Sequence, residues 1–193
     1  FYNLGNAYYR LHNVPRAILN YERALLRDPG NGDYRFNLAL ARSKTIDKVP
    51  EESEMFFVSW TYALINMMSA DGWGRAALTA FGLGLLLLCL YLFSGRVLLR
   101  KIGFFGAFAM LFVVIVGNVF AGVQKGQLNA GDKAIVMEVT TVRSTPTAGG
   151  TELFVLHGRT KVEITDNTMR DWKEIRLADG KEGWIDARQI EVI

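Results

Sequence analysis

The sequence contains one cysteine, Cys89, and only two histidines among 193 residues. A lone cysteine cannot form an intramolecular disulfide, and it leaves no partner for a metal site of the usual spacing. His12 and His157 have no Cys, Asp or Glu beside them at the spacing of metal ligands or of a catalytic dyad. The sequence also has no HExxH or GxSxG motif. We therefore expect no catalytic residues, no metal and no cofactor, and a chain that is not an enzyme.

Acidic residues are nearly absent from the middle of the chain. Residues 55–130 contain 5 Lys/Arg and 1 Asp/Glu, whereas residues 1–54 contain 8 and 7, and residues 131–193 contain 9 and 11. The formal net charge of +3 therefore comes from the most apolar third of the chain. A nucleic-acid interface needs clustered basic side chains on a polar surface, so no nucleic-acid partner is expected.

Two long stretches have no charged residue at all. They run from Ala76 to Gly95 and from Ile102 to Gln124, and contain 20 and 23 residues. At about 1.5 Å per residue, each would form a helix of roughly 30 Å, which matches the hydrocarbon core of a bilayer. We predict a transmembrane hairpin at residues 74–124, with spans at 75–95 and 102–123, rather than two buried helices of a soluble protein.

The connector between the spans, residues 95–101, contains three basic residues and no acidic one, and the outer flanks contain fewer basic residues. The positive-inside rule therefore places this connector in the cytoplasm. Residues 1–54 and 131–193 would then both be extracytoplasmic, in the periplasm of a bacterium with two membranes. We expect a multi-pass protein of the bacterial inner membrane.

Few polar side chains lie inside the predicted spans. Asn118 is the one strongly polar residue deep in either stretch, and no ionisable residue accompanies it. Intramembrane transport sites usually need ionisable residues. We therefore favour an interhelical hydrogen bond for Asn118 over a role in transport.

The segment before the spans has a different pattern. Apolar side chains recur every three or four residues from Phe56 to Met68, which predicts an amphipathic helix at 55–71. It is short for a membrane span, so we place it along the outer membrane surface, with Trp73 as an interfacial anchor. Because it has no Lys or Arg, packing against a partner protein remains an alternative. Residues 46–54 are predicted to be a linker.

Residues 1–29 have small and aromatic residues at regular separations: Leu4, Gly5, Tyr8, Ala17, Tyr21, Ala24 and Pro29. This pattern resembles the tetratricopeptide (TPR) repeat, a pair of packed helices. After a turn, residues 34–44 predict a further helix. We assign residues 1–45 to an incomplete TPR repeat with a capping helix, and we expect more repeats upstream because about three are needed for stability.

The TPR resemblance also implies a binding face. In that family the concave surface binds peptide segments of partner proteins. The corresponding positions in this sequence are Tyr2, Asn6, Tyr9 and Arg10. The alternative is that these four are ordinary surface residues.

From Lys133 the hydrophobic period changes to two. Five or six short strands separated by turn residues predict a small barrel at 131–193. Four of the predicted strands are Ala134–Val142, Leu153–Leu156, Lys161–Thr165 and Trp172–Leu177.

Several motifs in this region resemble the bacterial SH3-like domain: Val-Arg-Ser-Thr-Pro at 142–146, Trp172 with Ile175, and Gly-Trp-Ile at 183–185. A groove that binds peptide or glycan would use Arg143, Trp172 and Trp184. Alternatively, both tryptophans are core or turn residues and Arg143 is solvated.

Taken in order, the segments resemble the BatE-type family of the bacterial aerotolerance (Bat) operons. The fold class is a multidomain membrane protein with all-α TPR helices, a two-helix transmembrane hairpin and an all-β SH3-like barrel. The resemblance implies a scaffold whose partners include the membrane-anchored von Willebrand A-domain Bat proteins. Two alternatives are a module that binds peptidoglycan or senses the cell envelope, and an enzyme whose catalytic domain lies upstream.

Overall fold

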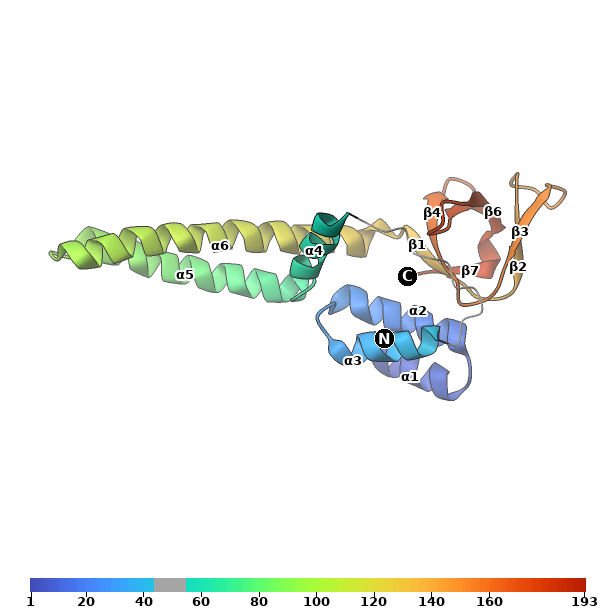
Figure 1. Cartoon of the computed structure of the whole chain (residues 1–193), viewed down its shortest axis with the longest axis horizontal. Helices are drawn as coiled ribbons and strands as arrows, with labels where there is room; N and C mark the ends of the chain where they lie inside the picture. Colours follow the sequence, from blue (N-terminus) through green and yellow to red (C-terminus); the bar gives the residue numbers. More distant parts are fainter. Residues whose placement is uncertain (44–54) are drawn as a thin grey trace. The chain divides into compact units, whose positions relative to one another are not determined.

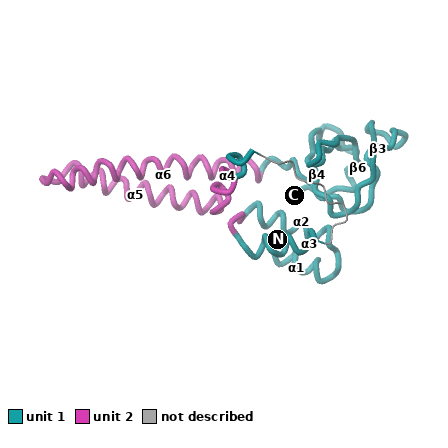
Figure 2. Tube along the Cα trace, viewed as in Figure 1, with its two compact units in different colours: residues 1–27, 31–59, 129–193 teal, residues 28–30, 60–128 magenta. Residues whose placement is uncertain are grey.

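The computed structural model describes residues 1–43 and 55–193. The linker predicted at 46–54 lies outside the described residues. The chain forms two compact units (Figure 2). Unit 1 consists of Phe1–Arg27, Asn31–Ser59 and Asn129–Ile193, and unit 2 consists of Asp28–Gly30 and Trp60–Leu128.

The helical part of unit 1 contains α1 (Tyr2–Arg10), α2 (Val14–Arg27) and α3 (Gly32–Arg42) (Figure 1). Helix α2 is the centre of this module because one face of it, including Ala17, Ile18 and Tyr21, is almost fully buried. Such an apolar stripe at helical spacing stabilises a helix mainly through packing.

Helix α3 begins two residues earlier than the predicted start at residue 34. The Oδ1 atom of Asn31 accepts hydrogen bonds from the backbone N–H groups of Asp33 (3.1 Å) and Tyr34 (3.3 Å). Asparagine is a favourable N-cap because it satisfies donors that have no partner within the helix. The predicted turn at residues 31–33 is therefore the start of the helix.

The predicted extent of the amphipathic helix, 55–71, is wrong. Helix α4 covers Phe56–Ile65, and a separate helix, α5, begins at Ala70. Ser69 is the N-cap of α5, because its hydroxyl accepts a hydrogen bond from the Gly72 N–H at 3.2 Å. Asp71 in the first turn adds a favourable interaction with the helix dipole. The residues predicted to end the amphipathic helix thus start the next helix.

Helices α5 (Ala70–Phe93) and α6 (Val97–Ala130) have 24 and 34 residues and are long and apolar enough to cross a bilayer. Helix α5 begins five residues before its predicted span and ends two residues before the predicted end, whereas α6 extends beyond its predicted span at both ends. The non-helical connector is only residues 94–96, shorter than the predicted 95–101, because residues 97–101, including Arg100 and Lys101, are already part of α6. Within unit 2 the helices approach closely at Trp73 and Phe120, whose rings pack edge to face with centroids 5.0 Å apart.

The C-terminal part of unit 1 is one antiparallel sheet with strand order β3-β2-β6-β5-β4-β1-β7. Its strands are β1 (Lys133–Val136), β2 (Thr140–Arg143), β3 (Glu152–Leu156), β4 (Lys161–Asp166), β5 (Trp172–Arg176), β6 (Glu182–Asp186) and β7 (Ile190–Val192). A short 3₁₀ helix, η1 (Ala187–Gln189), precedes β7.

The predicted strand Ala134–Val142 is wrong, since it consists of two strands, β1 and β2. Strand β1 pairs with β4 and β7, whereas β2 pairs with β3 and β6. The chain therefore leaves one pair of neighbours and joins another between Met137 and Val139. Alternating side chains fill the core: Ala134, Val136, Val142, Leu156, Val162, Ile164, Ile175, Leu177 and Ile185.

Candidate functional site

The predicted TPR face lies on α1, where two of its four residues take part in packing between helices. Tyr2 stacks on Tyr34 of α3 with ring centroids 4.5 Å apart, and its hydroxyl accepts a 2.6 Å hydrogen bond from Nδ2 of Asn37. The Tyr21 hydroxyl donates a 2.7 Å hydrogen bond to Oδ1 of Asn6. Tyr2 and Asn6 therefore fix α1 against its neighbours while remaining half-buried.

The other two residues of this face differ from each other. Tyr9 is half-buried and packs against the helical core, and Arg10 is exposed in the last turn of α1. Burial raises the pKa of the Tyr21 hydroxyl, with smaller contributions from Tyr2 and Tyr9. Tyr21 is thus a neutral hydrogen-bond donor at physiological pH.

Sequence reasoning missed Tyr34 and Asn37, which extend the face onto α3. Their spacing of three residues puts both side chains on one side of that helix. This spacing was visible in the sequence, but only the contact with Tyr2 shows that α1 and α3 contribute to the same surface. We name Tyr2, Asn6, Tyr9, Arg10, Tyr34 and Asn37 the α1–α3 face.

A hollow of about 740 Å³ lies on the surface of the barrel. It contains two of the three predicted residues, Arg143 and Trp172. Trp184 is outside the lining, although it is the register partner of Arg143 across β2 and β6. The full lining is Val139, Thr140, Thr141, Arg143, Ala148, Asp171, Trp172, Asp186, Arg188 and Gln189.

Neither Trp172 nor Trp184 belongs to the barrel core. Both are half-buried, and on β6 the neighbour of Trp184, Ile185, is the residue that points inward and is fully buried. Side chains alternate between the two faces of a strand. Both tryptophans thus lie on the partly exposed face, where an aromatic ring can stack on a ligand.

Arg143 has structural partners of its own. Its Nη1 donates to the Gly150 carbonyl at 2.8 Å, and its Nη2 lies 3.2 Å from Oε1 of Glu152. These bonds hold the turn between β2 and β3 against the strand. They also fix the guanidinium at the edge of the hollow, where a ligand would meet a preorganised ion pair of Arg143 and Glu152.

Part of the lining of the hollow comes from the end of β6 and from η1. Oδ1 and Oδ2 of Asp186 accept hydrogen bonds from Arg188, including 2.6 Å from Nη2 and 2.9 Å from the backbone N–H. The Arg188 hydrogen bond lowers the pKa of the Asp186 carboxyl, and Asp186 in turn raises the pKa of Arg188. The pair stays charged over a wide pH range.

The hollow therefore combines carboxylates, guanidinium groups and one indole ring. Its volume falls within the range of small-molecule sites, about 300–1,000 Å³. Mixed charge around an aromatic surface suits a zwitterionic or peptide-like ligand better than a purely anionic one. Asp171, Asp186 and Arg188 were missed from the sequence because their positions depend on the turn before β5 and on η1.

The described residues, 1–43 and 55–193, contain no group of three or more His, Cys, Asp or Glu side chains that could hold a metal ion. The side chains of the two surfaces can bind a ligand by hydrogen bonds, ion pairs and stacking.

Comparison with protein families assigns both ends of the chain to binding-type modules. Residues 1–31 match the tetratricopeptide repeat, and residues 138–191 match the bacterial SH3 domain. A search of the curated proteins finds no match. The chain thus has a helical TPR region at its N-terminus, two long apolar helices, and a C-terminal antiparallel SH3 domain.

Proposed function

We propose that this protein is a non-enzymatic scaffold anchored in a bacterial inner membrane by α5 and α6, with its TPR and SH3 modules outside the cytoplasm. One observation supports this most strongly: two binding-type modules are joined in one chain by two long apolar helices whose apolar side chains are exposed. Leu86 is 67% exposed and Phe105 67% exposed. A soluble protein rarely exposes so large an apolar surface.

The contact between the modules also supports the proposed topology. Side chains of α2 and β1 pack together inside unit 1. Two crossings of the bilayer return the chain to the side on which it started, so the modules can meet only if the number of crossings between them is even.

We further propose that the α1–α3 face and the hollow of the barrel bind partner proteins of a Bat-type aerotolerance complex, including von Willebrand A-domain proteins. The proposed contacts are the four predicted TPR residues, Arg143 and Trp172 in the hollow, and Trp184, which lies outside its lining. Arg10 is the most accessible of the first group and Trp172 lines the hollow in the second.

Binding to a purified von Willebrand A-domain protein from the same genome tests this proposal with the full chain in nanodiscs. Arg10→Glu and Trp172→Ala should each weaken binding about tenfold, as expected for exposed charged and aromatic contacts in an interface. The matched control Arg27→Glu reverses an exposed charge on α2 that belongs to neither surface and lies over the Phe1 ring, 4.4 Å from its centroid. Unchanged affinity in both variants, or no binding at all, would contradict the proposal.

The composition of the hollow favours a second candidate, binding of peptidoglycan, whose stem peptides contain both carboxylate and amino groups. The full chain in detergent should then sediment with purified cell-wall sacculi, and Trp172→Ala should abolish sedimentation. If the chain stays in the supernatant, peptidoglycan binding is contradicted and the scaffold proposal is unaffected.

A further inference from the structure

The most informative feature outside the two proposed surfaces is a buried carboxylate on α2. Only 8% of the Glu22 side chain is exposed. Nζ of Lys161 on β4 donates to its Oε2 at 2.8 Å, and Arg42 of α3 donates to its Oε1. Each carboxylate oxygen thus has one cation, one from the helical module and one from the barrel. A buried charge is tolerated only when it is paired and hydrogen-bonded in this way.

A second, apolar contact lies beside this ion cluster. In β1, Ala134 and Val136 point into the barrel core, so Ile135 between them points outward. An outward residue of a strand normally meets solvent, yet Ile135 is 0% exposed. It is buried because it packs in the same cluster as Val14 and Ile18 of α2.

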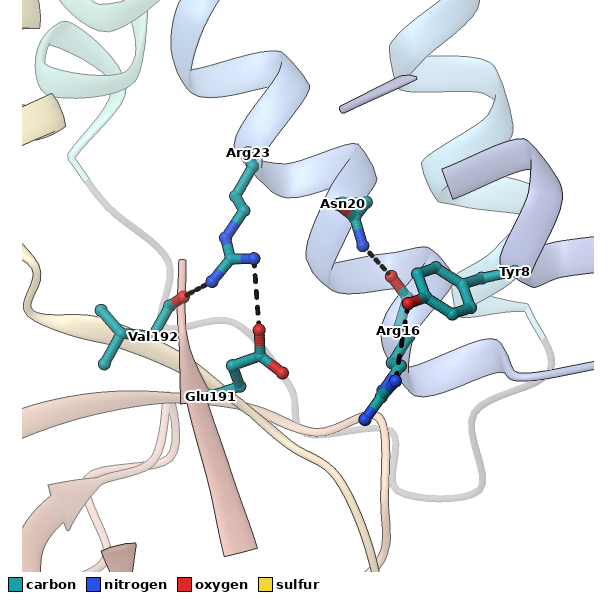
Figure 3. A network of polar contacts seen from close by, with 6 residues as sticks. All are labelled: Tyr8, Arg16, Asn20, Arg23, Glu191 and Val192. Carbon is teal, nitrogen blue, oxygen red and sulfur yellow. Dashed lines mark hydrogen bonds and ion pairs between the residues drawn. The ribbon is translucent and has the colours of Figure 1, made fainter. Parts of the chain in front are cut away.

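The third contact links α2 to β7. Nη1 of Arg23 lies 3.3 Å from Oε1 of Glu191, and Nη2 donates to the Val192 carbonyl (Figure 3). One of these bonds goes to a backbone oxygen. The contact therefore fixes the position of β7 and also neutralises the charge of Glu191. In the same view, Nδ2 of Asn20 donates to the Arg16 carbonyl and Arg16 donates to the Tyr8 hydroxyl, so these polar groups are used inside the helical module.

From these three contacts we infer that the SH3 barrel is the cap of the helical module in the same chain, docked on α2 through β1, β4 and β7. Helices α1 and α3 cover two sides of α2, and the barrel covers the apolar stripe that remains. Helical repeats need such a cap, because an unpaired end leaves apolar surface in water. In this chain a barrel supplies it in place of a further helix.

The consequence is one rigid binding platform. The α2 surface is closed to outside partners, and the α1–α3 face and the barrel hollow are held in the same body. A partner that binds both surfaces therefore gains from preorganisation, since it does not have to order the two modules. This inference does not depend on which partner the scaffold binds.

Hydrogen exchange of the full chain in nanodiscs tests the docking. Ile135→Asp should raise exchange of the α2 amides, residues 14–27, about tenfold or more, because a charge replaces a fully buried apolar contact. The amides of β5 and β6 should stay protected, since Ile135 does not point into the barrel core. The matched control Val155→Asp changes a β-branched, outward strand residue that is 51% exposed, and should leave α2 unchanged.

If Ile135→Asp unfolds the barrel, a second set of variants, in which the charges of Arg23 and Glu191 are swapped, still tests the docking. Arg23→Glu and Glu191→Arg should each raise α2 exchange, and the double variant should restore most of the protection. The inference is overturned if α2 exchange is unchanged in Ile135→Asp while the barrel is folded. It is also overturned if the double variant is no better than the single ones.

Crosslinking distinguishes docking of the barrel on α2 of the same chain from docking on α2 of a second chain. In a Cys89→Ala background, Arg23→Cys and Glu191→Cys should react with a short bismaleimide and give a crosslinked band at the monomer mass. A crosslinked band only at the dimer mass would overturn docking in the same chain.

Discussion

Glu22 and Lys161 are 139 residues apart in the sequence and joined by a 2.8 Å hydrogen bond. Between them lie both long apolar helices. Sequence periodicity does not indicate contacts between residues so far apart in the chain. Such contacts nevertheless decide whether the two modules are separate or form one body.

Glu22 should make docking depend on pH. Burial alone would raise its pKa, but the charges and hydrogen bonds of Lys161 and Arg42 hold the pKa below the usual glutamate value. A carboxyl whose pKa is lowered by folding stabilises the fold at any pH above its pKa in the unfolded chain, which is about 4.3 for glutamate. This stabilisation is lost as the pH falls through the pKa of the folded state.

Glu22→Gln should therefore destabilise unit 1 by about 1–3 kcal/mol at pH 7, and the difference from wild type should shrink below about pH 4. Chemical denaturation followed by tryptophan fluorescence at several pH values measures this. The control Glu138→Gln alters an exposed carboxyl of the barrel. An equal effect of Glu22→Gln at pH 7 and pH 3 would show that the ion cluster is not responsible.

Gly5 should be intolerant of any side chain. A Cβ atom there would lie 2.7 Å from ring atoms of Tyr21, which is 1% exposed and cannot move aside. We expect Gly5→Ala to reduce the free energy of unfolding by about 1–3 kcal/mol. Gly32→Ala is the control, since nothing lies within 4 Å of its Cβ position. Similar stability of the two variants would mean that α1 and α2 do not pack as described.

Gly103 should control the approach of α5 and α6. Its Cβ would lie 2.6 Å from the Leu87 carbonyl oxygen and 2.7 Å from the Tyr91 nitrogen, and backbone atoms cannot move as a side chain can. Close backbone approach at small residues is a common way for helices to associate in lipid.

Gly103→Leu should separate the helices and reduce crosslinking between cysteines placed on α5 and α6, whereas Gly122→Leu should have little effect, since its surroundings are open. Equal crosslinking in both variants would be evidence against this packing.

Gln124 should hold the corner between α4 and α5. It is 3% exposed, and its Nε2 donates at 2.8 Å to the carbonyl oxygens of Ile65 and Met68. Gln124→Leu leaves the Met68 carbonyl without this donor, at a cost of about 1–3 kcal/mol. Hydrogen exchange at residues 66–69 should rise, while α6 beyond the corner should be unchanged. No increase would mean that the Trp73 indole, which also donates to Ile65, is sufficient by itself.

Local sequence patterns were enough to predict the TPR helices, the two long apolar helices and several strands of the SH3 domain. The spacing of Gly5, Ala17 and Tyr21 encodes helix packing inside one repeat, so the TPR helices could be predicted, and the charge-free stretches marked α5 and α6. Boundaries were less predictable where a polar side chain has two possible uses. Asn31 was predicted to lie in a turn and Ser69 inside the amphipathic helix, and both are N-caps instead.

The candidate sites could be predicted only in part. Arg143 and Trp172 belong to recognisable motifs and do line the hollow, whereas Asp186 and Arg188 join it through the geometry of η1. Ile135 was a visible apolar residue on an outward strand position, but its partner on α2 could not be identified from periodicity.

The most direct test of the whole account is labelling of single cysteines in spheroplasts with a membrane-impermeant maleimide. The variants are Ser94→Cys in the connector and Thr147→Cys in an exposed turn of the barrel, both in a Cys89→Ala background. We predict that the chain is recovered in the membrane fraction, that the barrel cysteine reacts in intact spheroplasts, and that the connector cysteine reacts only after lysis. Recovery of the chain in the aqueous fraction, or the reverse labelling pattern, would contradict the account.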